Sequence, residues 1–446
     1  MTEPHTTAPE GPAAEAPPAE AAEVAEAEKP TYPVLLEPAE GIPDIVQDER
    51  RLMAAAEAIR GGEGPVALDA ERASGYRYGG RAYLVQLRRQ GSGSWLIDPI
   101  ACPDLSPLEE AIGDEEWVLH AATQDLPCLA EIGLHPSVLF DTELGSRIAG
   151  LPRVGLAAVI EHYLGISLAK EHSAVDWSTR PLPEPWLRYA ALDVEVLVEV
   201  RNRLREDLDS QGKLAWAMEE FSALTSFTGP PVRTDPWRRT SGMHKVRDRR
   251  AVARVRELWE TRDAIARERD ISPGRVLPDA VLVEIAVRAP GTAAALTAAT
   301  ASDAKSATSR RGKARPPHRS VARYQREWLD AVRRANAIPD RELPPSTVRT
   351  DAPPPQRAWA DRDPVAAERL QQVRDGLGAF GEEHQVPVEN LLTPDFLRRV
   401  LWHPPDPADQ PAVAAALSTL GARPWQVELA APLIADAIAE HPDTDE

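Results

Sequence analysis

Four carboxylates and one tyrosine have the residue types and spacing of a divalent metal site. Asp69 and Glu71 end a short apolar run, and their i, i+2 spacing puts both side chains on one face of a strand. Asp125 follows a second apolar run. Tyr189 and Asp193 are spaced i, i+4, so a helix stacks the phenol above the carboxylate. Converging acids repel one another unless cations lie among them, and Mg²⁺ or Mn²⁺ prefer such oxygen ligands.

Two such ions about 3.5–4 Å apart would suit displacement at a phosphodiester. An Asp-x-Glu pair alone is weak evidence in a chain with 70 acidic residues, because acids at strand ends more often cap helices or face solvent. The combination is more specific. Of the seven tyrosines, only Tyr189 has an aspartate four residues later.

The combined pattern resembles the DEDD exonucleases with tyrosine in the third motif, and among them the ribonuclease D family. The segment 140–142 (Phe-Asp-Thr) after the second motif and the segment 176–182 (Asp-Trp-Ser-Thr-Arg-Pro-Leu) before the third also look like this family. The resemblance spans about residues 45–225. It implies that two divalent ions, Mg²⁺ or Mn²⁺, are held by four acids and that Tyr189 orients the attacking water. The four acids are Asp69, Glu71, Asp125 and Asp193.

These side chains need a sheet and helices to bring them together. Apolar alternation and glycine-containing turns predict three antiparallel strands, and strand–helix alternation follows. The predicted strands are 64–71, 82–89, 94–98, 116–120 and 138–141, and the predicted helices are 48–60, 124–132, 142–149, 155–164 and 184–207. The fold class is therefore α/β, with a mixed sheet in a domain at residues 31–228. The resemblance implies the ribonuclease H-like version of this architecture.

The turn between the first two main strands carries cations and aromatic rings beside the first acidic motif. Arg72, Tyr76, Tyr78 and Arg81 suit phosphate contact and base stacking, so they are predicted to bind substrate. An ordinary polar turn with tyrosines packed at its rim is an equally good interpretation. His120 lies near Asp125 and is a further candidate for substrate contact, although a buried histidine with its own hydrogen-bond partner is the commoner case.

The C-terminal half is predicted to be all α. Residues 238–338, with helices at 245–269 and 278–288, resemble a helicase-and-ribonuclease-D C-terminal (HRDC) domain. A proline-rich linker at 339–357 follows. Residues 358–446 resemble a second, diverged HRDC-like bundle, in which Arg374-Asp375 is matched to Arg262-Asp263.

Charge is distributed unevenly along the chain. The net charge is −19, but residues 241–350 carry 23 bases and 13 acids, a net of +10. This segment is the electrostatic candidate for a polyanion, unless its arginines only solvate helix faces beside acids. Residues 1–30, rich in alanine, glutamate and proline, are expected to be disordered. The residues predicted to bind nucleic acid are Arg310, Arg311, Lys313 and Arg315.

The resemblance implies a 3′–5′ exoribonuclease that releases nucleoside 5′-monophosphates from RNA 3′ ends, with tRNA precursors as the family's expected substrates. A DNA-directed exonuclease and a non-catalytic RNA-binding scaffold are the alternatives. A helicase is excluded by the lack of a phosphate-binding Gly-x-x-x-x-Gly-Lys-Ser/Thr loop. Two cysteines predict no disulfide framework and fit a reducing cytoplasm. No membrane span is expected, and the oligomeric state is open.

Overall fold

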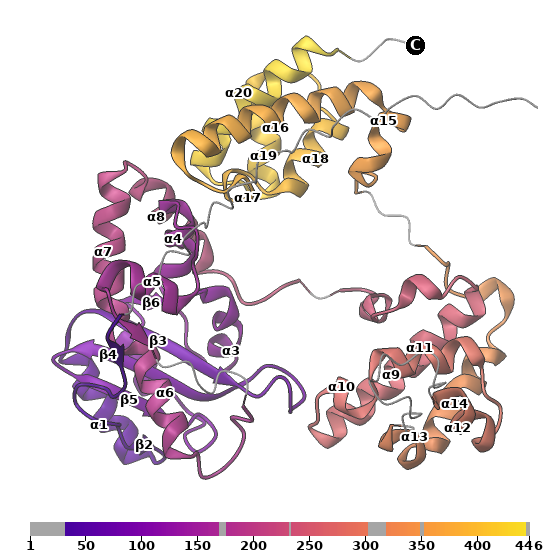
Figure 1. Cartoon of the computed structure of the whole chain (residues 1–446), viewed down its shortest axis with the longest axis horizontal. Helices are drawn as coiled ribbons and strands as arrows, with labels where there is room; N and C mark the ends of the chain where they lie inside the picture. Colours follow the sequence, from indigo (N-terminus) through magenta and orange to yellow (C-terminus); the bar gives the residue numbers. More distant parts are fainter. Residues whose placement is uncertain (1–31, 169–174, 232, 302–317, 348–351, 443–446) are drawn as a thin grey trace, which may run out of the picture.

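The computed structural model describes residues 32–168, 175–231, 233–301, 318–347 and 352–442. Within these ranges the chain forms an α/β domain (residues 32–224), a first helical bundle (residues 236–337) and a C-terminal helical bundle (residues 359–440), as Figure 1 shows. The predicted disordered tail lies outside the described residues. The same is true of the predicted nucleic-acid contacts Arg310, Arg311, Lys313 and Arg315.

One mixed six-stranded sheet forms the centre of the α/β domain, with strand order β2-β5-β4-β3-β6-β7. β4 pairs antiparallel with both β3 and β5, whereas β6 and β7 continue the sheet in parallel. The predicted mixed sheet is confirmed. The strands are β2 (Ile45–Val46), β3 (Glu63–Arg72), β4 (Ala82–Gln90), β5 (Gly93–Ile97), β6 (Glu116–Leu119) and β7 (Val138–Asp141); β1 (Val34–Leu35) and β8 (Ser167–Leu168) form a separate parallel pair.

Alternation along β3 sends its side chains to two different helical layers. Val66 and Leu68 are fully buried in the core that includes α1 (Glu49–Arg60) and α2 (Ser106–Ile112). Ala67 packs on the other face, against the α6 and α7 layer. Asp69 and Glu71 share the side of Ala67 and therefore point toward α6. The remaining helices of this domain are α3 (Leu126–Glu131), α4 (Thr142–Ala149), α5 (Leu156–Leu164), α6 (Glu184–Glu195), α7 (Leu197–Ser210) and α8 (Leu214–Leu224).

Two helices of the α/β domain differ from their predicted extent, and the helix predicted over 245–269 begins four residues later, at Arg249. The helix predicted over 184–207 is broken at Val196 into α6 and α7. Alternate valines in this stretch lower its helix propensity, which favours a break. The helix predicted over 124–132 is a 3₁₀ turn, Ala122–Gln124, followed by α3, and Asp125 lies at their junction.

Both C-terminal modules are helical bundles with their own apolar cores. The first contains short 3₁₀ turns at Pro236–Arg239 and Met243–Lys245, then α9 (Arg249–Arg269), α10 (Pro273–Val276), α11 (Asp279–Arg288), α12 (Ala293–Thr300), α13 (Arg319–Arg323) and α14 (Gln325–Ala337). The C-terminal bundle contains α15 (Trp359–Arg362), α16 (Pro364–His384), α17 (Val388–Leu391), α18 (Pro394–Trp402), α19 (Gln410–Leu420) and α20 (Pro424–Glu440). None of the helices in the described ranges is long and apolar enough to cross a membrane.

The two bundles share a local pattern, but not in the predicted register. The long helices α9 and α16 both end at a residue in the left-handed conformation, Asp270 and Gln385, and a four-residue helix follows each. Aligning these ends places Leu377, rather than Arg374, opposite Arg262. The predicted match of Arg374 with Arg262, which allowed small insertions, therefore needs three extra residues before the end of α16, nearly one helical turn, and stays a prediction.

Candidate active site

Three of the predicted acids meet where the end of β3 faces α6. Asp69 and Glu71 extend from the same face of β3, and Asp193 extends from α6. One carboxylate oxygen from each lies within 4.8 Å of the others. This geometry brings acids from distant segments close enough to share one cation.

Asp125 approaches the cluster from the start of α3 and is buried. It lies outside the tight three-acid group, but the charges of Asp69 and Asp193 act on it. The Arg72 Nη2 lies 3.5 Å from the Asp125 Oδ1 and favours its ionised form. Arg72, predicted to bind substrate, therefore holds a carboxylate of the site in this structure.

The turn that carries Asp125 is anchored by Asp141, the acid of the Phe-Asp-Thr segment. The Asp141 carboxylate accepts hydrogen bonds from the backbone N–H groups of Ala121 and Ala122, at 3.0 and 2.9 Å. It also caps α4 by accepting from the N–H groups of Glu143 and Leu144. Four backbone donors on one carboxylate fix the path from β6 to Asp125.

Crowding makes full ionisation of these acids unfavourable without a cation. Burial, followed by the charges of Asp69, Asp193 and Asp125, raises the pKa of Glu71 to about 10. Burial also raises the pKa of Asp69, and burial with the Asp69 charge raises that of Asp193 well above the usual range. A divalent cation among these carboxylates would lower their pKa values and favour their ionised forms. The all-oxygen donor set fits Mg²⁺ or Mn²⁺.

Tyr189 is a hydrogen-bond donor in this site. Its hydroxyl is hydrogen-bonded to the carboxylate of Asp193, one helical turn away. Burial, and then the charges of Asp193 and Glu71, raise the pKa of the Tyr189 phenol above its usual value. The phenol therefore stays protonated at neutral pH and orients groups rather than removing a proton. Its ring lies 6.4 Å from that of the buried Trp177.

Arg180 fixes the loop that leads into α6. It forms an ion pair with Asp98 at the end of β5, with Nε 2.8 Å from Oδ2. Its guanidinium also donates to the carbonyls of Tyr83 and Trp177, both at 2.8 Å. Burial opposes ionisation of Asp98, but the hydrogen bond and charge of Arg180 hold its pKa below the usual value. The segment before the third motif therefore positions α6, and with it Tyr189.

Two other predicted substrate contacts have protein partners. The His120 Nδ1 lies 2.9 Å from the Thr142 Oγ1, and burial lowers the pKa of His120 to about 4. This is the pattern of a neutral, packed histidine. The Arg81 guanidinium lies over the Tyr83 ring and donates to its hydroxyl at 3.1 Å. Contact of His120 and Arg81 with substrate stays a prediction.

The β3–β4 loop, residues 73–81, contacts the first bundle. The Tyr78 hydroxyl lies 3.0 Å from Asp263 and 3.1 Å from Arg267. The Arg275 guanidinium lies 4.0 Å from the Tyr76 ring centre, and the Ser272 N–H donates to the Tyr76 carbonyl at 3.0 Å. In this structure both rings therefore have partners within the chain. These partners lie 185 or more residues further along the chain, so local sequence patterns cannot show them. RNA contact by Tyr76 and Tyr78 stays a prediction.

Gln86 is a site residue that the sequence reasoning missed. It is the cross-strand partner of Asp69, and its Nε2 donates to the Asp69 Oδ2 at 3.1 Å. The available signal was a single amide within the apolar run of β4, where a fully buried polar side chain needs a partner.

Three family descriptions match successive parts of the chain. Residues 43–209 match a 3′-5′ exonuclease family, residues 251–313 match the HRDC domain, and residues 352–438 match a 3′ to 5′ exonuclease C-terminal domain. The first bundle is therefore an HRDC domain. The C-terminal bundle matches the 3′ to 5′ exonuclease C-terminal domain, and its likeness to an HRDC domain stays a prediction.

Curated relatives extend across these parts. Ribonuclease D of Gluconacetobacter diazotrophicus is 30% identical over 382 residues, which cover 83% of this chain and 87% of the relative. Ribonuclease D of Granulibacter bethesdensis is 31% identical over 313 residues, covering 68% and 73% respectively. The chain belongs to the ribonuclease D family. The predicted enzyme class of this ribonuclease D-family chain, a 3′–5′ exoribonuclease, is confirmed.

Solved structures agree with the fold of this ribonuclease D-family chain. A protein from Bifidobacterium adolescentis is 39% identical with a TM-score of 0.79, covering 92% of this chain and all of that one. Escherichia coli RNase D, described as an exoribonuclease involved in structured RNA processing, has a TM-score of 0.64 at 24% identity. It covers 90% of this chain and 99% of its own. The predicted order of a mixed-sheet exonuclease domain followed by helical modules is confirmed.

Proposed function

We propose that this chain removes nucleotides from RNA 3′ ends at a site that holds two Mg²⁺ or Mn²⁺ ions, and that it releases nucleoside 5′-monophosphates. The observation that carries the proposal is the convergence of Asp69, Glu71 and Asp193, whose carboxylate oxygens lie within 4.8 Å of one another. When bound, such ions supply an activated water and neutralise charge on the phosphate and the leaving 3′ oxygen.

The protein groups would divide the remaining work. Asp69, Glu71 and Asp193 would hold one ion among them, and Asp125 would complete the second position from α3. The protonated hydroxyl of Tyr189 would orient the attacking water near Asp193. Arg72 would favour the ionised form of Asp125, which burial and the neighbouring acids oppose, since its guanidinium lies 3.5 Å from that carboxylate.

The substrates we propose are 3′ extensions of tRNA precursors or other small structured RNAs. Two features support RNA of this kind: the family itself, and the segment 241–350 with its net charge of +10. A cytoplasmic location is also proposed, because the two cysteines are free and buried rather than joined.

The direct test compares RNA carrying a 3′ tail with DNA of matched sequence. Purified full-length protein is incubated with each, with Mg²⁺ or with excess EDTA, and product length is followed on a gel. Stepwise shortening of RNA should need Mg²⁺ and should vanish in the Asp69→Asn and Asp193→Asn variants. Full activity in EDTA, or normal turnover by Asp69→Asn, would overturn the metal site. Preferred digestion of DNA would reassign the substrate, and inert native protein would indicate a binding scaffold.

Tyr189→Phe separates the hydroxyl from the ring. The single-turnover rate constant should fall while RNA affinity barely changes, because the lost hydrogen bond acts mainly in the transition state. Tyr163→Phe is a matched control, since the Tyr163 hydroxyl donates to Asp207 at 2.8 Å away from the acidic cluster. Equal rate constants for Tyr189→Phe and native protein would reduce Tyr189 to a packing residue.

The full chain also serves to test whether the positively charged segment 241–350 contributes to RNA binding. Charge reversal at Arg310, Arg311, Lys313 and Arg315 should weaken RNA binding and flatten its salt dependence, since each phosphate contact contributes a slope of about −0.7. Cleavage of short oligonucleotides should persist, because the acidic cluster lies in the α/β domain. An unchanged salt slope would assign RNA binding to other residues.

A further inference from the structure

Two neighbouring polar residues of β4 point to the same face as the acids of β3. Gln86 and Arg88 lie two positions apart, so both leave β4 on one side, opposite to Val85 and Leu87, and this side packs against α6. Gln86 lies directly across from Asp69 in the ladder, and Arg88 lies across from Ala67. β4 thus carries an amide and a guanidinium next to a site built from β3 and α6.

Gln86 contacts the first of the acids directly. Its side chain is 0% exposed, and its Nε2 lies 3.1 Å from the Asp69 Oδ2. This donated hydrogen bond restrains the orientation of a carboxylate that belongs to the three-acid cluster. Among the described residues the Gln86 Oε1 has no hydrogen-bond partner, so this amide stabilises the fold less than a fully paired one would.

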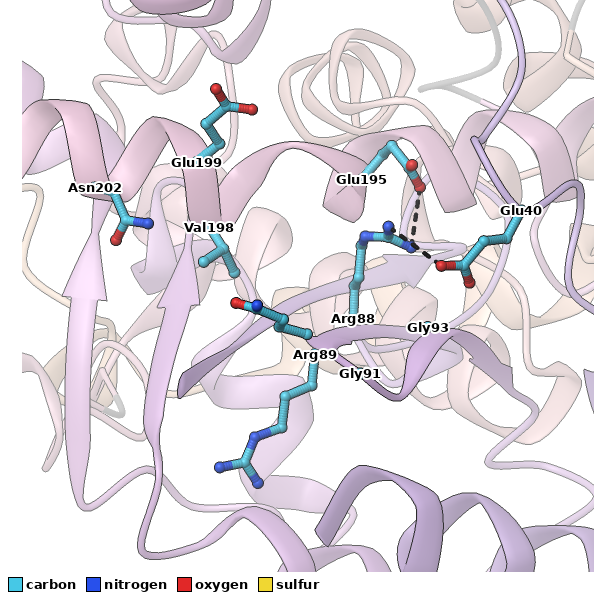
Figure 2. A pocket seen from close by; sticks show the side chains of 10 residues that line it. Glu40, Arg88, Arg89, Gly91, Gly93, Glu195, Val198, Glu199 and Asn202 are labelled. Atoms are coloured by element: carbon cyan, nitrogen blue, oxygen red, sulfur yellow. Dashed lines mark ion pairs between the residues drawn. The ribbon is translucent and has the colours of Figure 1, made fainter. Parts of the chain in front are cut away.

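Arg88 reaches the other side of the site through Glu195. The Arg88 Nη1 lies 3.4 Å from the Glu195 Oε2, and the Glu195 side chain is 6% exposed. Figure 2 shows Arg88 extending from the strand toward Glu195 and Glu40. The Ser94 Oγ, at 2.8 Å, holds the same nitrogen of Arg88 from β5.

Glu195 lies where it can set the position of Asp193. It is the last residue of α6, two positions after Asp193 and directly before the break at Val196. Its Oε1 accepts a hydrogen bond from the Ala39 N–H at 3.1 Å. The end of α6 is therefore tied both to β4 and to the segment that precedes β2.

We propose that Gln86 and Arg88 are positioning residues, through which β4 sets the carboxylate of Asp69 directly and that of Asp193 by way of Glu195. The inference rests on the proposed metal site. Groups that hydrogen-bond to metal-binding carboxylates commonly affect affinity or activity by about 10–100-fold, and neither residue needs to touch RNA to have this effect.

Gln86→Leu is the sharpest test, because a positioning role and a purely structural role of Gln86 predict different results. Leucine has a similar size and removes a buried, incompletely paired amide, so the thermal unfolding midpoint should stay equal or rise. Mn²⁺ affinity, measured without RNA by electron paramagnetic resonance, should fall about 10–100-fold. Mn²⁺ affinity within about twofold of native would overturn the role of Gln86.

Arg88→Met and Arg89→Met form a matched pair on adjacent residues. Arg89 points away from Arg88 in Figure 2 and donates to the carbonyls of Ile59 and Gly64. Arg88→Met should weaken Mn²⁺ binding about tenfold, with partial recovery in Arg88→Lys. Arg89→Met should lower the unfolding midpoint and leave Mn²⁺ affinity unchanged. Equal effects of both on Mn²⁺ affinity would assign the Arg88 result to general destabilisation.

A double variant tests the route through Glu195. If Arg88 acts by way of Glu195, then Arg88→Met with Glu195→Gln should weaken Mn²⁺ binding no more than the stronger single variant. Additive losses would overturn that route.

Asp69→Asn separates failure of this inference from failure of the proposed function. Native Mn²⁺ affinity in Asp69→Asn would remove the metal site itself. Lost Mn²⁺ binding in Asp69→Asn together with native affinity in Gln86→Leu and Arg88→Met would remove only the role of β4.

Discussion

The first bundle contacts the α/β domain at the β3–β4 loop, whereas the C-terminal bundle contacts it at α8. The first contact is polar and charged. Arg77 lies 3.6 Å from Asp270, and the Arg275 Nε donates to the Gly75 carbonyl at 2.7 Å. With the Tyr78 hydroxyl between Asp263 and Arg267, this interface combines hydrogen bonds, an ion pair and cation–aromatic pairs, and the Tyr78 ring packs against the core of the bundle.

The C-terminal contact is built on aromatic rings. Trp216 of α8 stacks on Trp425 with ring centres 5.1 Å apart and an angle of 14° between the planes. Phe380 lies 5.9 Å from the same indole. Glu219 and Glu220 accept hydrogen bonds from the Trp425 N–H and Nε1 groups, at 2.9 and 3.0 Å. Polar groups here orient an apolar contact.

We therefore expect the polar contact of the first bundle to open readily and the aromatic contact of the C-terminal bundle to stay closed. Exposed charged pairs contribute little and are screened by salt, whereas packed aromatic rings contribute through buried area. The adjustable contact is the one beside the acids, since the β3–β4 loop begins directly after Arg72. Each prediction below tests this contrast.

Trp216→Ala should have the largest effect. Removal of the indole deletes the stack with Trp425 and should cost about 2–4 kcal/mol of the docking free energy of the C-terminal bundle. Limited proteolysis should then release this bundle, and thermal unfolding should split into separate transitions. Trp402→Ala is the control, because it removes the Trp359–Trp402 pair inside the bundle. Resistance of Trp216→Ala to proteolytic release would contradict the aromatic anchor.

Tyr78→Phe should loosen the first bundle by about 1–2 kcal/mol, since it removes the hydroxyl from Asp263 and Arg267 and keeps the ring. Amide hydrogen exchange should rise in the β3–β4 loop and at the end of α9, while α8 keeps its protection. A double-mutant cycle with Asp263→Asn should show coupling between the two positions. Unchanged exchange in the loop would show that the hydroxyl does not hold this contact.

Raising the salt concentration should act on one contact only. Between about 0.1 and 1 M NaCl the screening length falls from about 10 to 3 Å, so protection of the β3–β4 loop should decline by up to about 1 kcal/mol. The amide protection of α8, where the C-terminal bundle packs, should stay the same or increase. Equal salt sensitivity of the β3–β4 loop and α8 would contradict the proposed difference between a polar and an aromatic contact.

The smallest effect is a pH dependence at Glu220. Burial raises the pKa of Glu220 despite its ion pair with Arg423, so the folded state binds its proton more tightly than the unfolded state. Stability from this group is therefore greatest at low pH and declines as pH rises from about 4.5 through the raised value. Glu220→Gln should abolish this slope in unfolding curves of the full chain recorded at several pH values. A retained slope would assign the pH dependence to another group.

The sheet and the convergence of the acids could be predicted because their signals are local. Alternation sets which residues of β3 share a face, and the i, i+4 spacing places Tyr189 above Asp193 wherever α6 packs. The break at Val196 could not be read from spacing. At this break Glu195 is held by Arg88 and by the segment before β2, and only the folded structure shows these contacts.

Partners from distant segments were also beyond the sequence pattern. Tyr78 looked like a ring available to RNA, but its hydroxyl meets Asp263, 185 residues further along the chain. Gln86 looked like one polar residue in a buried strand until the ladder register placed it across from Asp69. Local patterns fix which face a side chain takes, whereas the packing of separate elements decides what it meets there.

The first bundle is connected to the rest of the molecule at both of its ends. The chain leaves α8 through residues 225–235 to enter the first bundle, and it leaves α14 through residues 338–358 to reach α15 (Figure 1). Because the C-terminal bundle is fixed back onto α8, the first bundle is in effect an insertion with two tethers. Tethering holds a released domain at an effective concentration on the order of millimolar beside its docking site. A contact too weak to unite two separate proteins therefore suffices here, and release of the first bundle is readily reversed.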